Sequence, residues 1–179
     1  MGRRDASKYV LDAETGKYDY IGVRYGIMAD EKDIKRFQRW GLAASLGIVA
    51  LFLGSGLITY SGMNSTLVLT PNVLMMVAGM WLCYNMVKLF RKGDELTEAA
   101  NKRMLHVTWS SLAAGILGAL AAVAQLVYSV LNGWTPGDWL FILLMACAAP
   151  LGVLVFYLVR KCPTEPLYID DIPEIEEEI

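Results

Sequence analysis

The sequence predicts an all-α integral membrane protein with four transmembrane helices arranged as two hairpins, and a small N-terminal β-hairpin in the cytosol. Apolar residues make up 55% of the 179-residue chain, and no Asp, Glu, Lys or Arg occurs between Trp40 and Val87. A second run, from Met104 to Val159, contains a single residue of these types, Asp138. Each run is about twice the roughly 20 apolar residues that one helix needs to cross a bilayer, so each is expected to hold two helices.

The short charged segment Arg91–Arg103 connects the two predicted membrane hairpins. The four membrane helices are expected at Trp40–Tyr60, at Pro71–Phe90, at about Leu105–Leu131 and at about Trp139–Val159. A helix of about 21 residues is about 31 Å long, which matches the hydrocarbon thickness of a bilayer. The chain therefore divides into a polar N-terminal region (1–39), a transmembrane region (40–159) and an acidic tail (160–179).

The basic residues set the predicted orientation. All 16 Lys and Arg lie outside the loops Ser61–Thr70 and Asn132–Asp138. The positive-inside rule therefore places both chain termini in the cytosol. We expect an integral protein of a bacterial plasma membrane, with the lipid bilayer as its surroundings. The net charge of −2 gives no reason to expect a nucleic-acid partner.

The N-terminal region is expected to form a cytosolic cap. In Lys8–Ile21, two runs rich in Tyr, Val, Leu and Ile flank a turn that ends at Gly16, a pattern typical of a β-hairpin. This hairpin is expected to pack on its own bundle or tail or, alternatively, to dock onto a partner. Asp30 is a predicted N-cap for a helix that lies at the membrane surface and runs into the first span. The basic residues of this helix, placed to meet anionic headgroups, are Lys32, Lys35, Arg36 and Arg39.

The tail begins with the basic pair Arg160–Lys161 and then becomes acidic. Its three prolines, Pro163, Pro166 and Pro173, argue against a regular helix. Leu167–Ile169 is expected to add as a strand to the edge of the N-terminal hairpin. The alternative is a solvated tail without regular structure.

The two hairpins share a short motif beyond their hydropathy. Tyr60-Ser61 and Tyr128-Ser129 each precede an Asn three residues after the Ser, and a Thr-Pro pair follows each motif, at Thr70-Pro71 and at Thr135-Pro136. The match indicates a tandem repeat or, alternatively, two hairpins under the same interfacial constraints. In each Thr-Pro pair, Thr is expected to be an N-cap and Pro the first helical residue. Asp138 then takes the acidic position of a capping box, an interpretation we prefer over a proton-carrying carboxylate.

Small side chains predict where the helices pack, because lipid provides no hydrophobic drive for helices to associate. In the first helix they form the stripe Ala43, Gly47, Ala50 and Gly54. In the third helix Ala114, Gly118 and Ala121 share a face with Gln125. Gln125 is expected to hydrogen-bond inside packed protein, with Asn85 of the second helix as a candidate partner. Pro150 is expected to kink the fourth helix and is a candidate hinge.

The chain offers few groups for catalysis. Its one histidine, His106, has no orienting carboxylate within a helical turn and no further metal ligand at a suitable spacing. Cys83 and Cys147 are interpreted as small apolar side chains. Neither a glycine-rich phosphate loop nor a nucleophile-elbow or zinc-protease motif occurs. We therefore expect no enzymatic activity, no cofactor and no bound metal.

The expected function is that of a non-enzymatic scaffold or accessory subunit of a membrane complex. Such a protein associates with copies of itself, as a homo-oligomer, or with another membrane protein. The alternative is an oligomeric channel or permease for a neutral or hydrophobic solute, since polar side chains such as Gln125 and Asn85 offer an uncharged path. A membrane enzyme that uses His106 is the third and weakest hypothesis.

Overall fold

The computed structural model describes residues 9–11, 18–20, 24–89 and 95–167. Its main helices are α1 (Glu31–Gly56), α2 (Thr66–Leu89), α3 (Glu98–Asn132), α4 (Pro136–Ala146) and α5 (Ala148–Arg160). Within these residues, four helical segments are long and apolar enough to span a membrane, with α4 and α5 together forming the fourth. The predicted bundle of four membrane helices is thereby confirmed.

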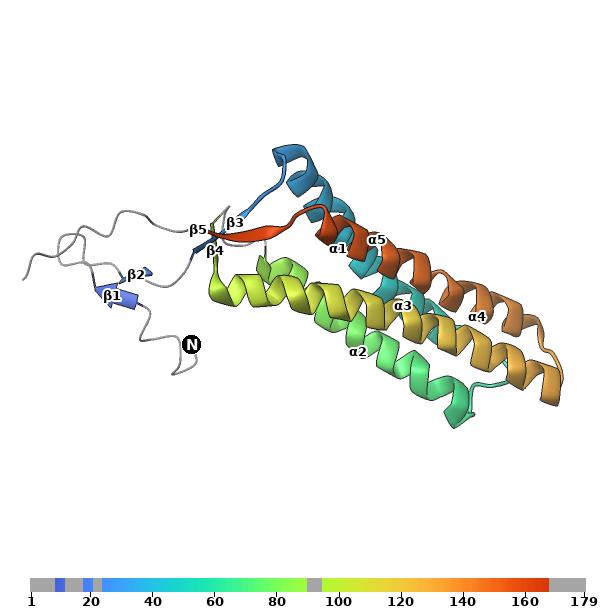
Figure 1. Cartoon of the computed structure of the whole chain (residues 1–179). Helices are drawn as coiled ribbons and strands as arrows, with labels where there is room; N and C mark the ends of the chain where they lie inside the picture. The colour runs from blue at the N-terminus through green and yellow to red at the C-terminus, as the bar shows by residue number, and fades with distance from the viewer. Residues whose placement is uncertain (1–8, 12–17, 21–23, 90–94, 168–179) are drawn as a thin grey trace, which may run out of the picture.

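The helices form an elongated bundle with two distinct ends (Figure 1). Helix α3 packs against α2, α4 and α5, whereas α1 packs against α2, α4 and α5 from the other side. Short strands lie at one end, which we call the sheet end, and the two interhelical loops 57–65 and 133–135 lie at the other, which we call the loop end. Helices α1 and α3 therefore lie diagonally opposite each other in the bundle.

Helix α1 begins where the sequence predicts. Asp30 is its N-cap residue, and the carbonyl of Asp30 accepts hydrogen bonds from the N–H groups of Asp33 and Ile34 at 2.8 and 3.0 Å. The polar first turns continue without interruption into the apolar part of the helix. The predicted surface helix and the first membrane span are thus one element.

The predicted N-cap at Thr70-Pro71 is wrong. Helix α2 begins at Thr66 and contains Pro71 in its second turn. The carbonyl of Ser65 accepts hydrogen bonds from the N–H groups of Val68 and Leu69 at 3.1 and 2.9 Å, so the helix is established one turn earlier. Pro71 has no N–H to donate to the carbonyl of Leu67, so α2 lacks one backbone hydrogen bond near its start. The equivalent prediction at the second pair is confirmed, since α4 begins at Pro136 with Thr135 as its N-cap.

The two copies of the Tyr-Ser motif occupy different backbone structures. Tyr60 and Ser61 lie in the loop between α1 and α2, whereas Tyr128 and Ser129 lie inside α3. Matching residues of a structural repeat would be expected in equivalent positions. The motif therefore does not mark a structural repeat.

The fourth span is interrupted at Cys147, between α4 and α5. Pro150 follows three residues later and has no N–H to donate to the carbonyl of Ala146. The interruption thus falls where the sequence predicts a kink. Motion at this hinge stays a prediction.

A three-stranded antiparallel sheet forms the sheet end. Its strands are β3 (Arg24–Ile27), β4 (Glu95–Thr97) and β5 (Thr164–Leu167), in the order β4-β3-β5. Tyr25 of β3 pairs with Leu96 of β4 and with Pro166 of β5. The sheet therefore joins the segment before α1, the connection between the hairpins and the segment after α5.

The sheet differs from what the sequence predicts. The tail does add a strand to the N-terminal region, but β5 pairs with β3 and not with the predicted hairpin. Strand β4, inside the charged connection, has no counterpart in the prediction. Strands β1 (Tyr9–Leu11) and β2 (Tyr18–Tyr20) pair antiparallel, with Val10 opposite Asp19. The turn of this hairpin and Tyr168–Ile169 lie outside the described residues, so the hairpin as a whole stays a prediction.

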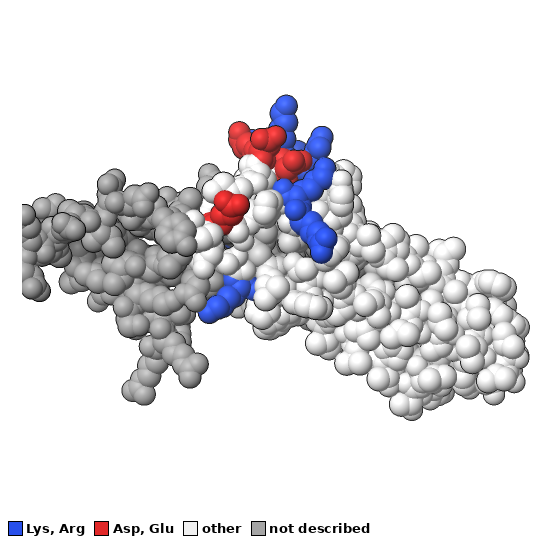
Figure 2. All heavy atoms as spheres, in the orientation of Figure 1, with Lys and Arg blue, Asp and Glu red and all other residues white. Residues whose placement is uncertain are grey.

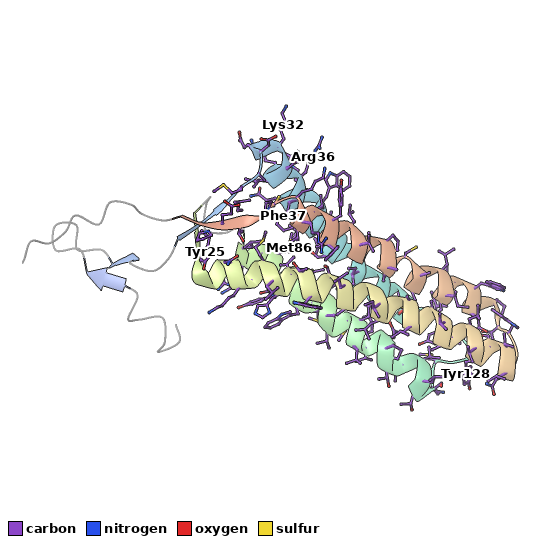
Figure 3. All side chains as sticks on the ribbon, in the orientation of Figure 1. Tyr25, Lys32, Arg36, Phe37, Met86 and Tyr128 are labelled. Carbon is purple, nitrogen blue, oxygen red and sulfur yellow. The ribbon has the colours of Figure 1, made fainter. Side chains whose placement is uncertain are left out.

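Apolar side chains fill the interior along the whole bundle. At the sheet end, Phe37 of α1 and Met86 of α2 are fully buried and lie close together against Gly41 (Figure 3). Large apolar side chains also cover the outer surface, among them Leu53 at 61% and Val77 at 55% exposure. An apolar exterior around an apolar core is expected for a bundle that lies in lipid.

We expect β5 to shield the thiol of Cys162, which is 1% exposed and lies two residues before the strand. Burial also raises the pKa of the Cys162 thiol, so little reactive thiolate forms near neutral pH. In a background with Cys83→Ala and Cys147→Ala, a chain that ends at Pro163 is expected to react with a maleimide several-fold faster than one that ends at Leu167. Equal labelling rates would show that β5 does not cover this end.

Candidate functional site

Five polar residues gather inside the loop end and form what we call the loop-end cluster. They come from three parts of the chain: the α1–α2 loop, the last turns of α3 and the start of α4. Asp138, Gln125 and Ser129 are fully buried. The members of the cluster are Ser61, Gln125, Ser129, Thr135 and Asp138.

Asp138 is the centre of the loop-end cluster. Its Oδ1 accepts hydrogen bonds from the Ser61 N–H at 2.8 Å, from Gln125 Nε2 at 2.9 Å and from the Thr135 hydroxyl at 2.8 Å. Its Oδ2 accepts from the Thr135 N–H at 2.7 Å and from the Ser61 hydroxyl at 3.0 Å. The carboxylate thereby links the α1–α2 loop to α3 and to the first turn of α4.

The predicted capping box is confirmed and explains part of this arrangement. Asp138 lies in the first turn of α4, three residues after the N-cap Thr135, and its side chain accepts the Thr135 N–H. The amino end of a helix carries partial positive charge, which favours an anion at this position. The start of α4 therefore stabilises a negative charge on Asp138 independently of the distant residues of the cluster.

Gln125 and Ser129 complete the cluster from α3. Gln125 Nε2 lies 2.9 Å from Ser129 Oγ and 3.1 Å from Ser61 Oγ as well as near Asp138, so its two hydrogens are shared among three acceptors. Ser129 Oγ in turn donates to the carbonyl of Gln125 at 2.9 Å. On the other side of the amide, Gln125 Oε1 lies so close to Gly62 that a Cβ there would overlap it. Glycine at residue 62 thus leaves room for the Gln125 amide and for Val68 Cγ2, which would lie 2.9 Å from a Cβ there.

The α1–α2 loop also inserts a side chain into the bundle. Tyr60 is 6% exposed, and its ring centroid lies 4.1 Å from that of Phe141 in α4. Between the two helices that this loop connects, Asn72 Nδ2 of α2 donates to Ser55 Oγ of α1 at 3.4 Å. Among the described residues, Asn72 Oδ1 and Gln125 Oε1 are buried acceptors without a hydrogen-bond donor. The loop is thus part of the packed interior.

The geometry of Asp138 suits a structural role better than proton transfer. A carboxylate offers about four lone-pair directions, and five donors occupy them here. Protonation would turn one oxygen into a donor that faces other donors, so it would break hydrogen bonds. The arrangement therefore favours a carboxylate that accepts hydrogen bonds and holds the loop end together.

The predicted stripe of the first helix is divided between two faces. Gly47 and Gly54 face the fourth span, where a Cβ would lie 3.2 Å from Leu151 Cδ1 and 3.9 Å from Leu144 Cδ1, respectively. Ala43 and Ala50 are exposed on the outer surface of the bundle. The buried residues of α1 are instead Phe37, Gly41, Ala44, Ser45, Ile48 and Ser55.

The predicted small residues of the third helix are all in the interior. Ala114, Gly118 and Ala121 are buried on the same face as Gln125. A Cβ at Gly118 would overlap the Cβ of Ala148 and lie 2.9 Å from the carbonyl oxygen of Met145. Close packing of α3 on the fourth span therefore depends on glycine at residue 118.

Gly152 of α5 is a close-packing residue that the sequence analysis missed. A Cβ at Gly152 would overlap the carbonyl oxygen of Ser111 and lie 3.1 Å from the Cα of Gly115. The signal that points to it is a glycine in the middle of a membrane helix, where small residues let backbones approach.

The structure does not bring Asn85 and Gln125 together. The buried Asn85 donates its amide to the carbonyl of Trp81, one turn earlier in its own helix, at 2.8 Å. His106 is exposed, and its ring centroid lies 6.3 Å from that of Trp81 in an edge-to-face arrangement. Pro150 is exposed as well. In the described part of the chain no group of three or more His, Cys, Asp or Glu is placed to hold a metal.

No family model matches the chain, and neither the curated proteins nor the solved structures compared with it give a match.

Proposed function

We propose that the protein is a non-enzymatic scaffold or accessory subunit of a membrane complex, with its sheet end on the cytosolic side of a bacterial plasma membrane. The observation that carries this proposal is the sheet β4-β3-β5. It gathers three separate chain segments at one end of an otherwise apolar bundle. Such a platform gives a partner a defined surface next to the membrane.

The outer edge of β5 is poorly suited to pairing with another strand. The Met28 N–H donates to the carbonyl of Pro163 at 2.8 Å, and hydrogen-bonded and non-bonded pairs alternate along an antiparallel ladder. The Tyr25–Pro166 pair is therefore a non-bonded one, and the nitrogen of Pro166 faces the outer edge. Because proline has no N–H, β5 offers an added strand few donors.

The outer edge of β4 is the better docking position. Tyr25 uses its backbone groups toward Leu96, so the alternation turns the backbone groups of Glu95 and Thr97 away from β3. An extended peptide can pair with such an edge through main-chain hydrogen bonds. We propose that the partner supplies an extended segment to β4.

The test is native mass spectrometry of the protein extracted with its surrounding lipid in a nanodisc-forming polymer. The wild type is expected to carry a second protein at fixed stoichiometry. Glu95→Pro removes an outward-facing N–H from β4 and is expected to release that protein, whereas Glu95→Ala keeps the N–H and is expected to retain it. Equal retention in both variants, or a wild-type monomer, would contradict the proposal.

The alternative proposal is an oligomeric channel or permease for a neutral or hydrophobic solute. Between the loop-end cluster and the sheet end, the interior of one chain is filled by the fully buried side chains of Ile48, Met75 and Leu82. A solute path therefore requires several copies around a shared axis. A closed homo-oligomer without a second protein, together with solute flux in liposomes, would favour this alternative.

A further inference from the structure

The first turns of α1 form a shallow pocket of about 240 Å³ that is lined by basic side chains. Spacings of three and four residues place these side chains within about two fifths of the helix circumference. Figure 3 shows Lys32 and Arg36 pointing away from the bundle, whereas Phe37 points into it. The lining residues, which we call the basic pocket, are Lys32, Lys35, Arg36, Arg39 and Trp40.

The basic pocket has positive charge that its own acids do not neutralise. Lys35 pairs with Glu31, and Arg36 Nη1 lies 3.7 Å from Asp33 Oδ1. The described residues place no acidic group within ion-pair distance of Lys32 or Arg39. The first ten residues of α1 (31–40) include four basic and two acidic side chains, which gives this part of the helix a net charge of +2. Figure 2 shows these charges gathered over the start of α1, beside an uncharged bundle.

The position of the basic pocket favours a lipid headgroup over a free anion as its ligand. Trp40 is 61% exposed, follows Arg39 in the sequence and begins the run without charged residues. The same helix face continues into the apolar stripe Ala43, Leu46, Ala50 and Leu53, all exposed. An anion in the pocket therefore has a hydrocarbon-facing surface directly beneath it.

We propose that the basic pocket binds the phosphate of one anionic phospholipid, whose acyl chain lies along this stripe of α1. Arginine side chains at residues 36 and 39 supply planar donors that match phosphate oxygens. Lys161, at the end of α5, interacts electrostatically with Arg36 and Asp33 and adds positive charge at the same level. Trp40 takes the interfacial position between headgroup and chain.

The test is a titration of the full chain, in detergent, with phosphatidylglycerol and with phosphatidylcholine of identical chains, followed by native mass spectrometry. The wild type is expected to bind one phosphatidylglycerol at least ~10-fold more tightly than phosphatidylcholine. The double variant Lys32→Gln/Arg39→Gln is expected to lose about 10- to 30-fold in that affinity, because each surface charge contributes about 1 kcal/mol.

The matched control is Lys88→Gln/Arg160→Gln, which removes the same charge from the same end of the bundle but outside the pocket. Its affinity for phosphatidylglycerol is expected to stay within about 2-fold of the wild type, which corresponds to less than about 0.5 kcal/mol. Equal losses in both double variants would show general surface attraction and overturn the proposal. Equal binding of the two lipids, or displacement of phosphatidylglycerol by millimolar inorganic phosphate, would overturn it as well. Helical circular dichroism verifies that both variants are folded.

Discussion

Replacing Asp138 with alanine is expected to lower the free energy of unfolding by about 2–4 kcal/mol, at the upper end of single-substitution effects, because it breaks a buried hydrogen-bond network. The carboxylate is fully buried and accepts five hydrogen bonds. Alanine would leave the backbone N–H groups of Ser61 and Thr135 without their acceptor and would remove one of the three acceptors of the Gln125 amide. Each donor that loses its acceptor in this way lowers stability by about 1–3 kcal/mol, and these losses are not additive.

The measurement is reversible unfolding of the reconstituted protein, followed by helical circular dichroism. Asp138→Asn keeps the shape and one oxygen but turns an amide NH₂ toward existing donors, so an intermediate loss is expected. Asn132→Ala is the control, because Asn132 lies at the same end but is exposed, and its loss is expected within about 0.5 kcal/mol.

Two outcomes would contradict this view of Asp138. If Asp138→Ala unfolds like the wild type, the loop-end cluster contributes little to stability. If Asp138→Asn is fully stable but abolishes solute flux in liposomes, the residue is a proton-carrying carboxylate, the interpretation that the sequence analysis disfavours.

The local half of this site was predictable from sequence, and the distant half was not. Thr135 and Asp138 are three residues apart, and that spacing is itself the capping-box signal. Ser61 lies 77 residues from Asp138, and its N–H and hydroxyl reach the carboxylate only because the α1–α2 loop and the start of α4 meet in the folded bundle. The shared Tyr-Ser motif includes Ser61 and Ser129, but nothing in the motif indicates that these residues meet Asp138.

The membrane spans were predictable because bilayer thickness requires long runs without charge. The sheet was not, because β4 has three residues and lies within a charged connection. Strands this short derive their structure from their neighbours more than from their own propensity. The start of α2 was misplaced because proline was assigned to the first helical position, although a second-turn proline at Pro71 removes only one early hydrogen bond.

The packing face of α1 shows a further limit of sequence patterns in membrane helices. In water, the buried face of a helix is its apolar face. In lipid both faces are apolar, so Ala43 and Ala50 look equivalent to Ala44 although only Ala44 is buried. Residue size alone therefore identified the small residues of α1 but not the face that packs.

Gly152→Ala is expected to lower the free energy of unfolding by about 1–3 kcal/mol, the usual range for overpacking. The added methyl would overlap the backbone carbonyl of Ser111 in α3, and backbone cannot rotate away as a side chain can. Helices α3 and α5 would have to separate along their contact, and lipid offers no hydrophobic force to hold them at a greater distance.

The matched control for Gly152→Ala is Gly56→Ala in α1, where no atom lies within 4 Å of the new Cβ. Because alanine favours helix over glycine by up to about 1 kcal/mol, this variant is expected to be as stable as the wild type or slightly more stable. Unfolding of the two variants in the same lipid separates contact from helix propensity. Equal stability would mean that α3 and α5 tolerate separation, and that the bundle depends instead on the loop-end cluster and the sheet to hold its helices together.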